Sequence, residues 1–309
     1  MLLDRILVPL DGSPAAEAIL PLLHRLLRAR GSEVVFHRSV SLLAAGLGVY
    51  PASGLDADRL LRELEGEATE YLSRIAAQVV PTGARARWVV KVGTPAESIL
   101  TVAKNEGATL VTMATHGRSG LTRWILGSVS EKVLRASPVP LLLVRSFHRS
   151  ETGEDRPAAH EAIRIRRLMV PVDLSELSLG LAPAVTDLAE AFGARIEVLH
   201  VREEPGHDQG DARHVLADAV REFQTRGEPV VPLLRHGDPA GAILETCRER
   251  SIDLVAMTTH GRSGLARWTI GSVTDKVLRT SGLPMLVVRE TGEEEAAVAG
   301  AWVAKEPLP

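Results

Sequence analysis

A block of 23 residues occurs twice in this chain, at a fixed offset of 144 positions. Residues 113–135 read MATHGRSGLTRWILGSVSEKVLR and residues 257–279 read MTTHGRSGLARWTIGSVTDKVLR, with 17 of the 23 positions identical. By contrast, residues 2–37 match residues 164–199 at only 9 of 36 positions. The chain therefore contains an internal duplication. The similarity between the two copies is concentrated in one glycine-rich segment, where we look for functional residues.

The two copies differ in length. Asp11 aligns with Asp173 at an offset of 162, whereas Gly93 aligns with Gly237 at an offset of 144. The first copy therefore carries 18 additional residues (162 − 144 = 18) between its second and third strands. We predict that this insertion falls around residues 40–58, a stretch with the glycine and proline residues typical of loops.

Each copy alternates short apolar runs with longer helical patterns, which is typical of a parallel sheet joined by right-handed crossovers. The predicted strands are 6–10, 33–37, 86–92, 109–113 and 140–145, then 168–172, 195–201, 230–235, 253–257 and 284–289. The predicted helices of the first copy are 14–29, 57–78, 95–106 and 128–136. The fold class is thus α/β, with two tandem, doubly wound, five-stranded parallel sheets.

Composition limits the classes of function. Hydrophobic residues make up 45% of the chain and charged residues 24%, a globular balance. The formal net charge of −3 gives no reason to expect nucleic-acid binding. Cys247 is the single cysteine, so we expect a reduced thiol on an apolar helix face. We find no signal peptide pattern and no stretch long enough to span a bilayer, and we predict a cytoplasmic protein without a membrane partner.

The polar stretch 148–164 contains a proline and no core-forming pattern, which is typical of a linker. We therefore predict a first domain over 1–147, the linker over 148–164 and a second domain over 165–290. A charged tail, 291–309, follows.

The distinctive residues fall where strands end. Asp11 follows the first strand, and the segment from Ala114 to Gly117 follows the fourth. If the strand order is 3-2-1-4-5, both segments face one crevice at the point where the order reverses, and ligands of open α/β sheets bind there.

The helix that starts after Gly127 offers free backbone N–H groups and a positive dipole end, which favour an anion. Gly117 lets the backbone approach a phosphate, and Ser128 adds a hydroxyl donor. Arg118 can pair with a terminal phosphate, while the carboxylate of Asp11 can accept from a ribose hydroxyl or an adenine amine. These parts together predict a nucleotide site.

Simpler interpretations stay open for several of these residues. Asp11 can be a turn that leads into a helix cap. Arg118 and Arg262 can lie on a solvated surface. Roles in orientation or packing are the simpler interpretation of His116, His260, Trp124 and Trp268, and we expect Ser13 and Ser175 to be helix N-caps.

Other chemical motifs are missing from the sequence. It contains no P-loop pattern, no dinucleotide fingerprint after a strand, no Cys/His cluster with metal-ligand spacing and no nucleophile elbow. We therefore assign no catalytic residue and no metal ligand.

Eight segments resemble the universal stress protein family. In the first copy they are ILVPLDGS (6–13), VVKVGTPAESIL (89–100), MATHGRSG (113–120) and GSVSEKVL (127–134). In the second they are LMVPVDLS (168–175), RHGDPAGAIL (235–244), MTTHGRSG (257–264) and GSVTDKVL (271–278). The resemblance covers nearly all of both repeats and implies an adenine nucleotide alpha-hydrolase-like fold with strand order 3-2-1-4-5.

The ATP-binding members of this family carry Gly, two residues, Gly, nine residues, then Gly followed by Ser or Thr. Both copies match the second and third glycines, but Ala114 and Thr258 stand where the pattern has its first glycine. A branched Thr258 is expected to crowd a ribose more than Ala114 does. Leu174 also replaces Gly12 and stiffens the turn, so the resemblance favours the first site over the second.

The resemblance implies the following contacts. The first site would use Pro9, Leu10, Asp11, Met113, Ala114, His116, Gly117, Arg118, Gly127, Ser128, Val129 and Ser130. The second would use Pro171, Val172, Asp173, Met257, Thr258, Gly261, Arg262, Gly271, Ser272, Val273 and Thr274.

The function that follows is an ATP-binding stress-response regulator with little or no hydrolysis, which takes ATP alone or with Mg²⁺. One alternative is a slow ATPase or nucleotidyl transferase that uses His116 and Arg118. Another is a partner-binding module whose nucleotide sites are degenerate.

The last strands of the copies, PLLLVR and PMLVVR, are apolar and would each end a sheet. Because an exposed apolar edge promotes aggregation, we expect the two to pair in an internal pseudo-dimer. The sequence leaves open whether two chains also associate into a homodimer.

Overall fold

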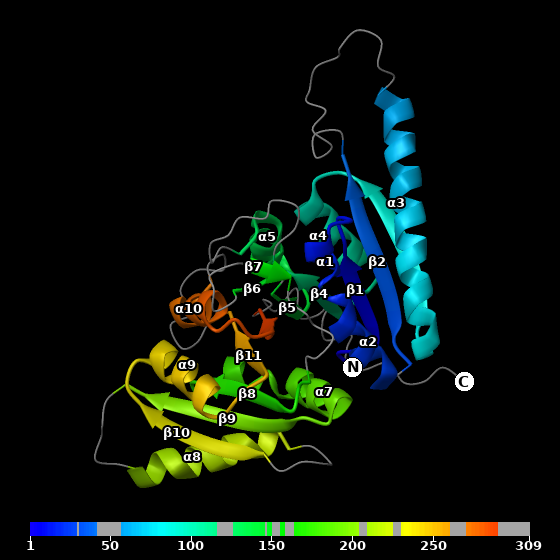
Figure 1. Cartoon of the computed structure of the whole chain (residues 1–309). Coiled ribbons are helices and arrows are strands. Elements are labelled where there is room, and N and C mark those ends of the chain that lie inside the picture. The colour runs from blue at the N-terminus through cyan, green and yellow to red at the C-terminus, as the bar shows by residue number, and fades with distance from the viewer. Residues whose placement is uncertain are drawn as a thin grey trace.

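The computed structural model describes residues 1–29, 31–41, 57–115, 126–145, 147–149, 155–157, 164–203, 209–224, 230–259 and 270–289. Within them, helices cover both faces of one twisted sheet of ten strands (Figure 1). Each copy of the repeat forms one half of that sheet.

The first half consists of β1 (Arg5–Pro9), α1 (Pro14–Glu17), α2 (Leu20–Ala29), β2 (Glu33–Val40), α3 (Ala57–Val79), the short 3-10 helix η1 (Val80–Thr82), β3 (Arg85–Val92), α4 (Pro95–Asn105), β4 (Leu110–Ala114), α5 (Ser128–Ala136) and β5 (Leu141–Val144). The second half consists of β8 (Arg167–Val172), α6 (Glu176–Leu179), α7 (Ala182–Phe192), β9 (Arg195–Arg202), α8 (Gln209–Glu222), β10 (Val231–His236), α9 (Pro239–Glu249), β11 (Leu254–Thr258), α10 (Ser272–Thr280) and β12 (Met285–Val288).

The strand order confirms the predicted fold class. The first half runs β3-β2-β1-β4-β5 and the second runs β10-β9-β8-β11-β12, and within each half every neighbouring pair is parallel. The order reverses beside β1 in one half and beside β8 in the other. These are the points where a doubly wound sheet leaves room for a ligand.

The halves join through their last strands. β12 pairs with β5 in the antiparallel direction, with Leu286 opposite Leu142. This confirms the expectation that the two apolar last strands pair. Because the pairing is antiparallel, the carboxyl ends of the parallel strands in the two halves lie at opposite edges of the sheet.

Two apolar layers continue across this junction. One contains side chains of α2, α3 and α7, and the other contains side chains of α4, α5, α9 and α10. Polar contacts also cross it: Leu2 N donates to Asp187 Oδ2 over 2.6 Å, and Arg289 Nη1 donates to the carbonyl of Arg135 over 3.2 Å. The halves therefore share their core and do not merely touch.

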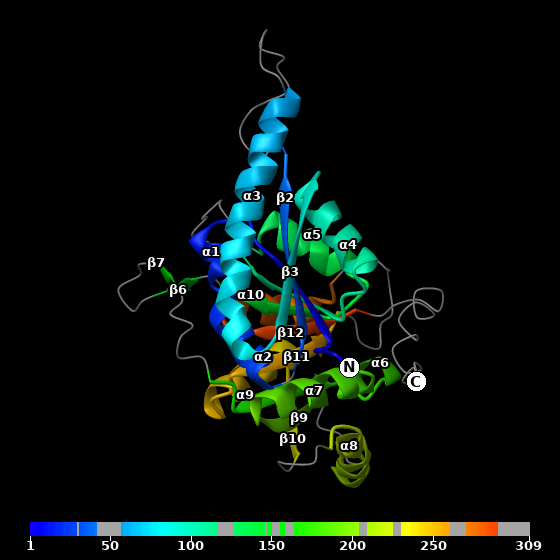
Figure 2. The ribbon, with the colours of Figure 1, turned by 90° about the vertical axis from the view of Figure 1, so that its right-hand side faces the viewer.

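Helix α3 confirms the helix predicted over residues 57–78. It has 23 residues, whereas its counterpart α8 has 14. Figure 2 shows α3 running beside β2 and β3. The rest of the predicted insertion, residues 42–56, lies outside the described residues.

The segment between the halves contains two short strands that the sequence pattern did not predict. β6 (Phe147–Arg149) and β7 (Asp155–Pro157) form an antiparallel ribbon with His148 opposite Arg156. Ile165 is already buried in the apolar layer of the second half. The polar stretch therefore contains local structure before the second core begins.

Candidate functional site

Helices α5 and α10 begin at the carboxyl ends of the strands of their own halves, without a side-chain cap among the described residues. Each starts after a glycine in an extended conformation: Gly127 at φ −56°, ψ 146° and Gly271 at φ −58°, ψ 144°. The glycine N–H groups donate to the carbonyls of Thr115, over 2.8 Å, and Thr259, over 2.6 Å. The next N–H groups have no partner inside the helix, so they can meet an anion.

Two other helices, one in each half, begin with a side-chain cap. Ser13 accepts from Ala16 N at the start of α1, and Ser175 accepts from Ser178 N at the start of α6. Both serines are thus the N-caps that the sequence predicted. The starts of α5 and α10 therefore differ from those of α1 and α6 in how their first turns are satisfied, whereas α4 also begins without a side-chain cap.

Ser130 and Thr274 hold these helix starts against the strand ends. Ser130 Oγ donates to the carbonyl of Ala114 over 3.2 Å, and Thr274 Oγ1 donates to that of Thr258 over 2.7 Å. Both side chains are buried. Their hydroxyls therefore fix the two helix starts, which form the predicted phosphate cradles, against the strand ends. The nucleotide contacts predicted for Ser130 and Thr274 would come from their backbone.

Asp11 and Asp173 sit in turns of the same design. Asp11 Oδ1 accepts from Ser13 N over 2.9 Å and from Ser13 Oγ over 2.6 Å. Asp173 Oδ1 accepts from Ser175 N over 3.1 Å and from Ser175 Oγ over 2.6 Å. The turn-and-cap interpretation is correct for both aspartates. This structural role is compatible with ligand binding, because one carboxylate oxygen can hold the turn while the carboxylate still faces the crevice.

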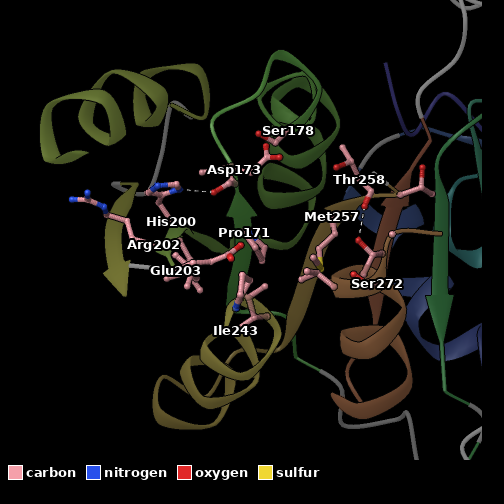
Figure 3. Close-up of a pocket in the computed structure, with 18 residues that line it drawn as sticks. Pro171, Asp173, Ser178, His200, Arg202, Glu203, Ile243, Met257, Thr258 and Ser272 are labelled. Carbon is pink, nitrogen blue, oxygen red and sulfur yellow. Dashed lines mark hydrogen bonds between the residues drawn. The ribbon is translucent and has the colours of Figure 1, made fainter. Parts of the chain in front are cut away.

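A cavity of about 580 Å³ opens at the switch point of the second half (Figure 3). Its volume is in the range of small-molecule sites. All nine second-site residues that the structure describes line it: Pro171, Val172, Asp173, Met257, Thr258, Gly271, Ser272, Val273 and Thr274. Thr258 is one of the lining residues, and the expectation that its branched side chain crowds a ligand stays a prediction.

The wall of this cavity that comes from β9 and α9 was not predicted from the sequence. That wall includes Leu199, His200, Arg202, Glu203 and Ile243. His200 Nδ1 donates to the carbonyl of Val172 over 2.9 Å, which fixes the ring beside the predicted base pocket. Figure 3 shows His200 of β9 beside Asp173, whereas the guanidinium group of Arg202 points away from Asp173. Knowing that β9 pairs with β8 would have been enough to find them.

In the first half, the described part of the predicted site has the same arrangement. Met113 and Ala114 are buried at the end of β4, and Leu10 N donates to the carbonyl of His37 over 2.8 Å. Gly127, Ser128 and Val129 form the start of α5 as predicted. His116, Gly117 and Arg118 lie outside the described residues, as do His260, Gly261 and Arg262, so their roles stay predictions.

The two turns differ at one residue. Gly12 has φ 84°, and Leu174 keeps the same left-handed backbone at φ 64°. A left-handed conformation costs a residue with a Cβ about 1 kcal/mol or more. The second half thus holds its aspartate in a strained turn, whereas the first half does not.

Three further observations limit the chemistry. Cys247 is buried on α9, as predicted, and burial raises the pKa of its thiol to about 12. Among the described residues, no group of three or more His, Cys, Asp or Glu side chains is placed to hold a metal ion. Within the same part of the chain, no helix is long and apolar enough to cross a membrane.

Comparison with known proteins identifies the family to which the chain belongs. The model of the universal stress protein family matches it twice, over residues 3–145 and 164–289. The two matches cover most of the sequence, so the chain belongs to the universal stress protein family, and it contains two of the family's domains in tandem.

Individual relatives agree with this assignment. Universal stress protein Sll1388 of Synechocystis is 32% identical over 149 residues, which are 46% of this chain and 97% of that protein. Universal stress protein Rv2005c of Mycobacterium tuberculosis is 31% identical over 198 residues, 60% of this chain and 63% of that protein. A crystal structure of a universal stress protein from Archaeoglobus fulgidus superposes with a TM-score of 0.71 at 22% identity, covering 94% of this chain and 99% of that one.

Proposed function

We propose that this protein is an ATP-binding regulator of the stress response, which binds an adenine nucleotide at the carboxyl edge of each half. The observation that carries the proposal is the cavity of the second half, which lies between the carboxylate of Asp173 and the uncapped start of α10. The same cavity is lined by every described residue of the predicted second site.

The phosphates would meet the backbone N–H groups of Ser272, Val273 and Thr274, where the helix dipole favours negative charge. Asp173 would accept a hydrogen bond from a ribose hydroxyl. The base would lie against the backbone of Pro171 and Val172. In the first half, Asp11 and the start of α5 would have the same roles.

ATP acts in this proposal as a ligand that fixes one conformation, with little or no hydrolysis. The nucleophile-and-base pair that fast hydrolysis uses is not among the residues that we assign to the sites. Mg²⁺ would enter with the phosphates of the nucleotide, because the described side chains form no metal cluster of their own.

Isothermal titration with ATP tests the proposal. Gly117→Val plus Gly127→Val should remove binding at the first site, and Gly261→Val plus Gly271→Val should remove it at the second. Each pair places side chains where the phosphate approaches the backbone. Far-UV circular dichroism and thermal unfolding of each variant serve as controls for folding.

The result expected is that each pair of substitutions removes one equivalent of bound ATP and leaves the other site intact. Unchanged affinity and stoichiometry in folded variants would refute the proposal. Turnover of Mg-ATP that is lost in His116→Ala would instead favour an enzyme. Freshly purified protein without any nucleotide in native mass spectrometry, together with no binding in titration, would favour a partner-binding module.

A further inference from the structure

In the first half, a planar cation lies beside the Asp11 turn. A Cβ placed on Gly12 would be 3.2, 3.3 and 3.4 Å from Nη1, Cζ and Nη2 of Arg38. Three nearly equal distances mean that Gly12 lies over the face of the guanidinium group. The group fits there because Gly12 has no side chain.

Tyr71 of α3 supports the same cation. Arg38 Cζ lies over the ring of Tyr71, 5.2 Å from its centroid. The ring is held in turn, because the hydroxyl of Tyr71 donates to Glu17 Oε1 over 2.8 Å. Tyr71 is buried, so the platform under Arg38 is fixed by packing. Cation–π contact of this kind orients a guanidinium group without using its N–H donors.

Arg38 is half-buried. Its contacts are with a glycine and an aromatic ring, and no carboxylate among the described residues forms an ion pair with it. Arg74 adds a second cation, 5.9 Å from the centroid of the same ring. A guanidinium group whose faces are packed and whose edge is open is suited to bidentate recognition of a phosphate.

The second half is not built in this way. Arg38 follows the residue that pairs with Pro9, and His200 follows the residue that pairs with Pro171, so the two occupy equivalent places. His200 is bonded to the carbonyl of Val172, and Leu174 replaces Gly12. A side chain at the glycine position would occupy the space over the guanidinium face.

We propose that Arg38, with Arg74 at the same tyrosine ring, forms an anion subsite of the first site that binds a phosphate carried on the 2′ or 3′ position of an adenosine ribose. The subsite rests on the proposed function, since Asp11 would hold the ribose next to it. An arginine in this place is how other α/β folds accept a ribose phosphate. Asp11 and Glu17 balance the two cations, so selectivity comes from the directed N–H groups and not from a general positive field.

The experiment compares the binding of AMP, adenosine 2′,5′-bisphosphate, adenosine 3′,5′-bisphosphate and ATP to the full chain by isothermal titration. One of the two bisphosphates should bind wild type about tenfold more tightly than AMP, which corresponds to about 1.4 kcal/mol. Arg38→Gln should reduce that ratio to about one. Arg38→Lys should retain part of it, because lysine keeps the charge but lacks the paired N–H donors of a guanidinium group.

The control is Arg28→Gln, an exposed arginine at the far end of α2 that loses the same charge. It should retain the wild-type ratio. A ratio near one in wild type, or an unchanged ratio in folded Arg38→Gln, would overturn the subsite.

The outcomes of this titration distinguish the anion subsite from the proposed ATP-binding function. If ATP binds and neither bisphosphate is preferred over AMP, the subsite is wrong and the nucleotide function stands. If a bisphosphate binds through Arg38 while ATP does not bind, the subsite stands and the ATP function is wrong. If no nucleotide binds, both are wrong.

Discussion

The two halves of this protein repeat the same site with different walls. Both have an aspartate turn closed by a serine cap and a helix that starts at an uncapped glycine. They differ where distant segments meet the turn: Gly12, Arg38 and Tyr71 in one half, Leu174 and His200 in the other. The proposed phosphate cradle is thus built from local sequence, whereas the surroundings of the proposed ribose position depend on tertiary contacts.

This contrast suggests that the halves divide their work. A shared cradle predicts that both bind a phosphorylated ligand, and unequal walls predict that they do not prefer the same one. Because the halves also share their sheet and both apolar layers, their stabilities should not be separable.

The largest expected effect concerns that shared core. Leu142 and Leu286 face each other across the junction and are fully buried. Leu286→Ala should lower the free energy of unfolding by about 3 kcal/mol. If the halves are one unit, urea unfolding followed by fluorescence and by circular dichroism should still show a single shared transition. Two separated transitions in wild type would show that the halves unfold independently.

A second prediction compares the ion pairs at the amino edge. Glu197 is fully buried and paired with Arg250, whereas Glu33 is partly exposed and shared between Arg5 and Arg87. Arg250→Met should cost about 2 kcal/mol, less than for a fully buried pair because Arg250 is about one-third exposed. Arg87→Met should cost less than 1 kcal/mol, since its pair is screened by water and Arg5 remains. Equal losses in urea unfolding would contradict this comparison.

The strained turn gives a third, smaller effect of opposite sign. Leu174→Gly should stabilise the protein by up to about 1 kcal/mol, because glycine adopts φ 64° without a Cβ penalty. Gly12→Ala should destabilise it, since it adds the same strain and a contact at 3.2 Å with Arg38. A loss of stability in Leu174→Gly would mean that packing of the leucine side chain outweighs the strain.

The smallest predicted effect is on pH dependence. His37 is buried beside Pro9, with Nδ1 2.9 Å from the carbonyl of Val89 and Nε2 2.9 Å from Ser98 Oγ, and burial lowers its pKa. As the pH falls, His37 is therefore protonated in the unfolded chain before it is protonated in the folded protein. Stability present above about pH 6.5 should decline as the pH falls from there through the folded pKa.

The matched variant for this prediction is His37→Leu, because Leu199 occupies the same place in the second half. Urea unfolding at pH 7.5 and at pH 5.5 should show a smaller difference in the variant than in wild type. An equal difference would assign the pH dependence to other groups.

The sequence predicted most of the fold because its signals are local. Apolar runs placed the strands to within a few residues, and the duplication gave the order of elements twice. Helical periodicity also predicted α3 over residues 57–78, to within one residue of its observed end. The ribbon of β6 and β7 was missed, because its strands are three residues long and polar.

The candidate site shows the same division. The aspartate turns, their serine caps and the glycine helix starts are short motifs, and the structure has them where the sequence put them. His200 and Arg38 were missed because they enter only through the pairing of β9 with β8 and of β2 with β1. Tyr71 lies 33 positions from Arg38, so no local pattern could have joined them.

The most direct test of the central claim is a titration of ¹⁵N-labelled protein with ATP, followed through the backbone amide resonances of Ser128 to Ser130 and Ser272 to Thr274. The account predicts that these amides shift in a saturable manner and that AMP, which lacks the outer phosphates, moves them less. Amides that stay unchanged at millimolar ATP would contradict it, because the uncapped helix starts would then bind no phosphate.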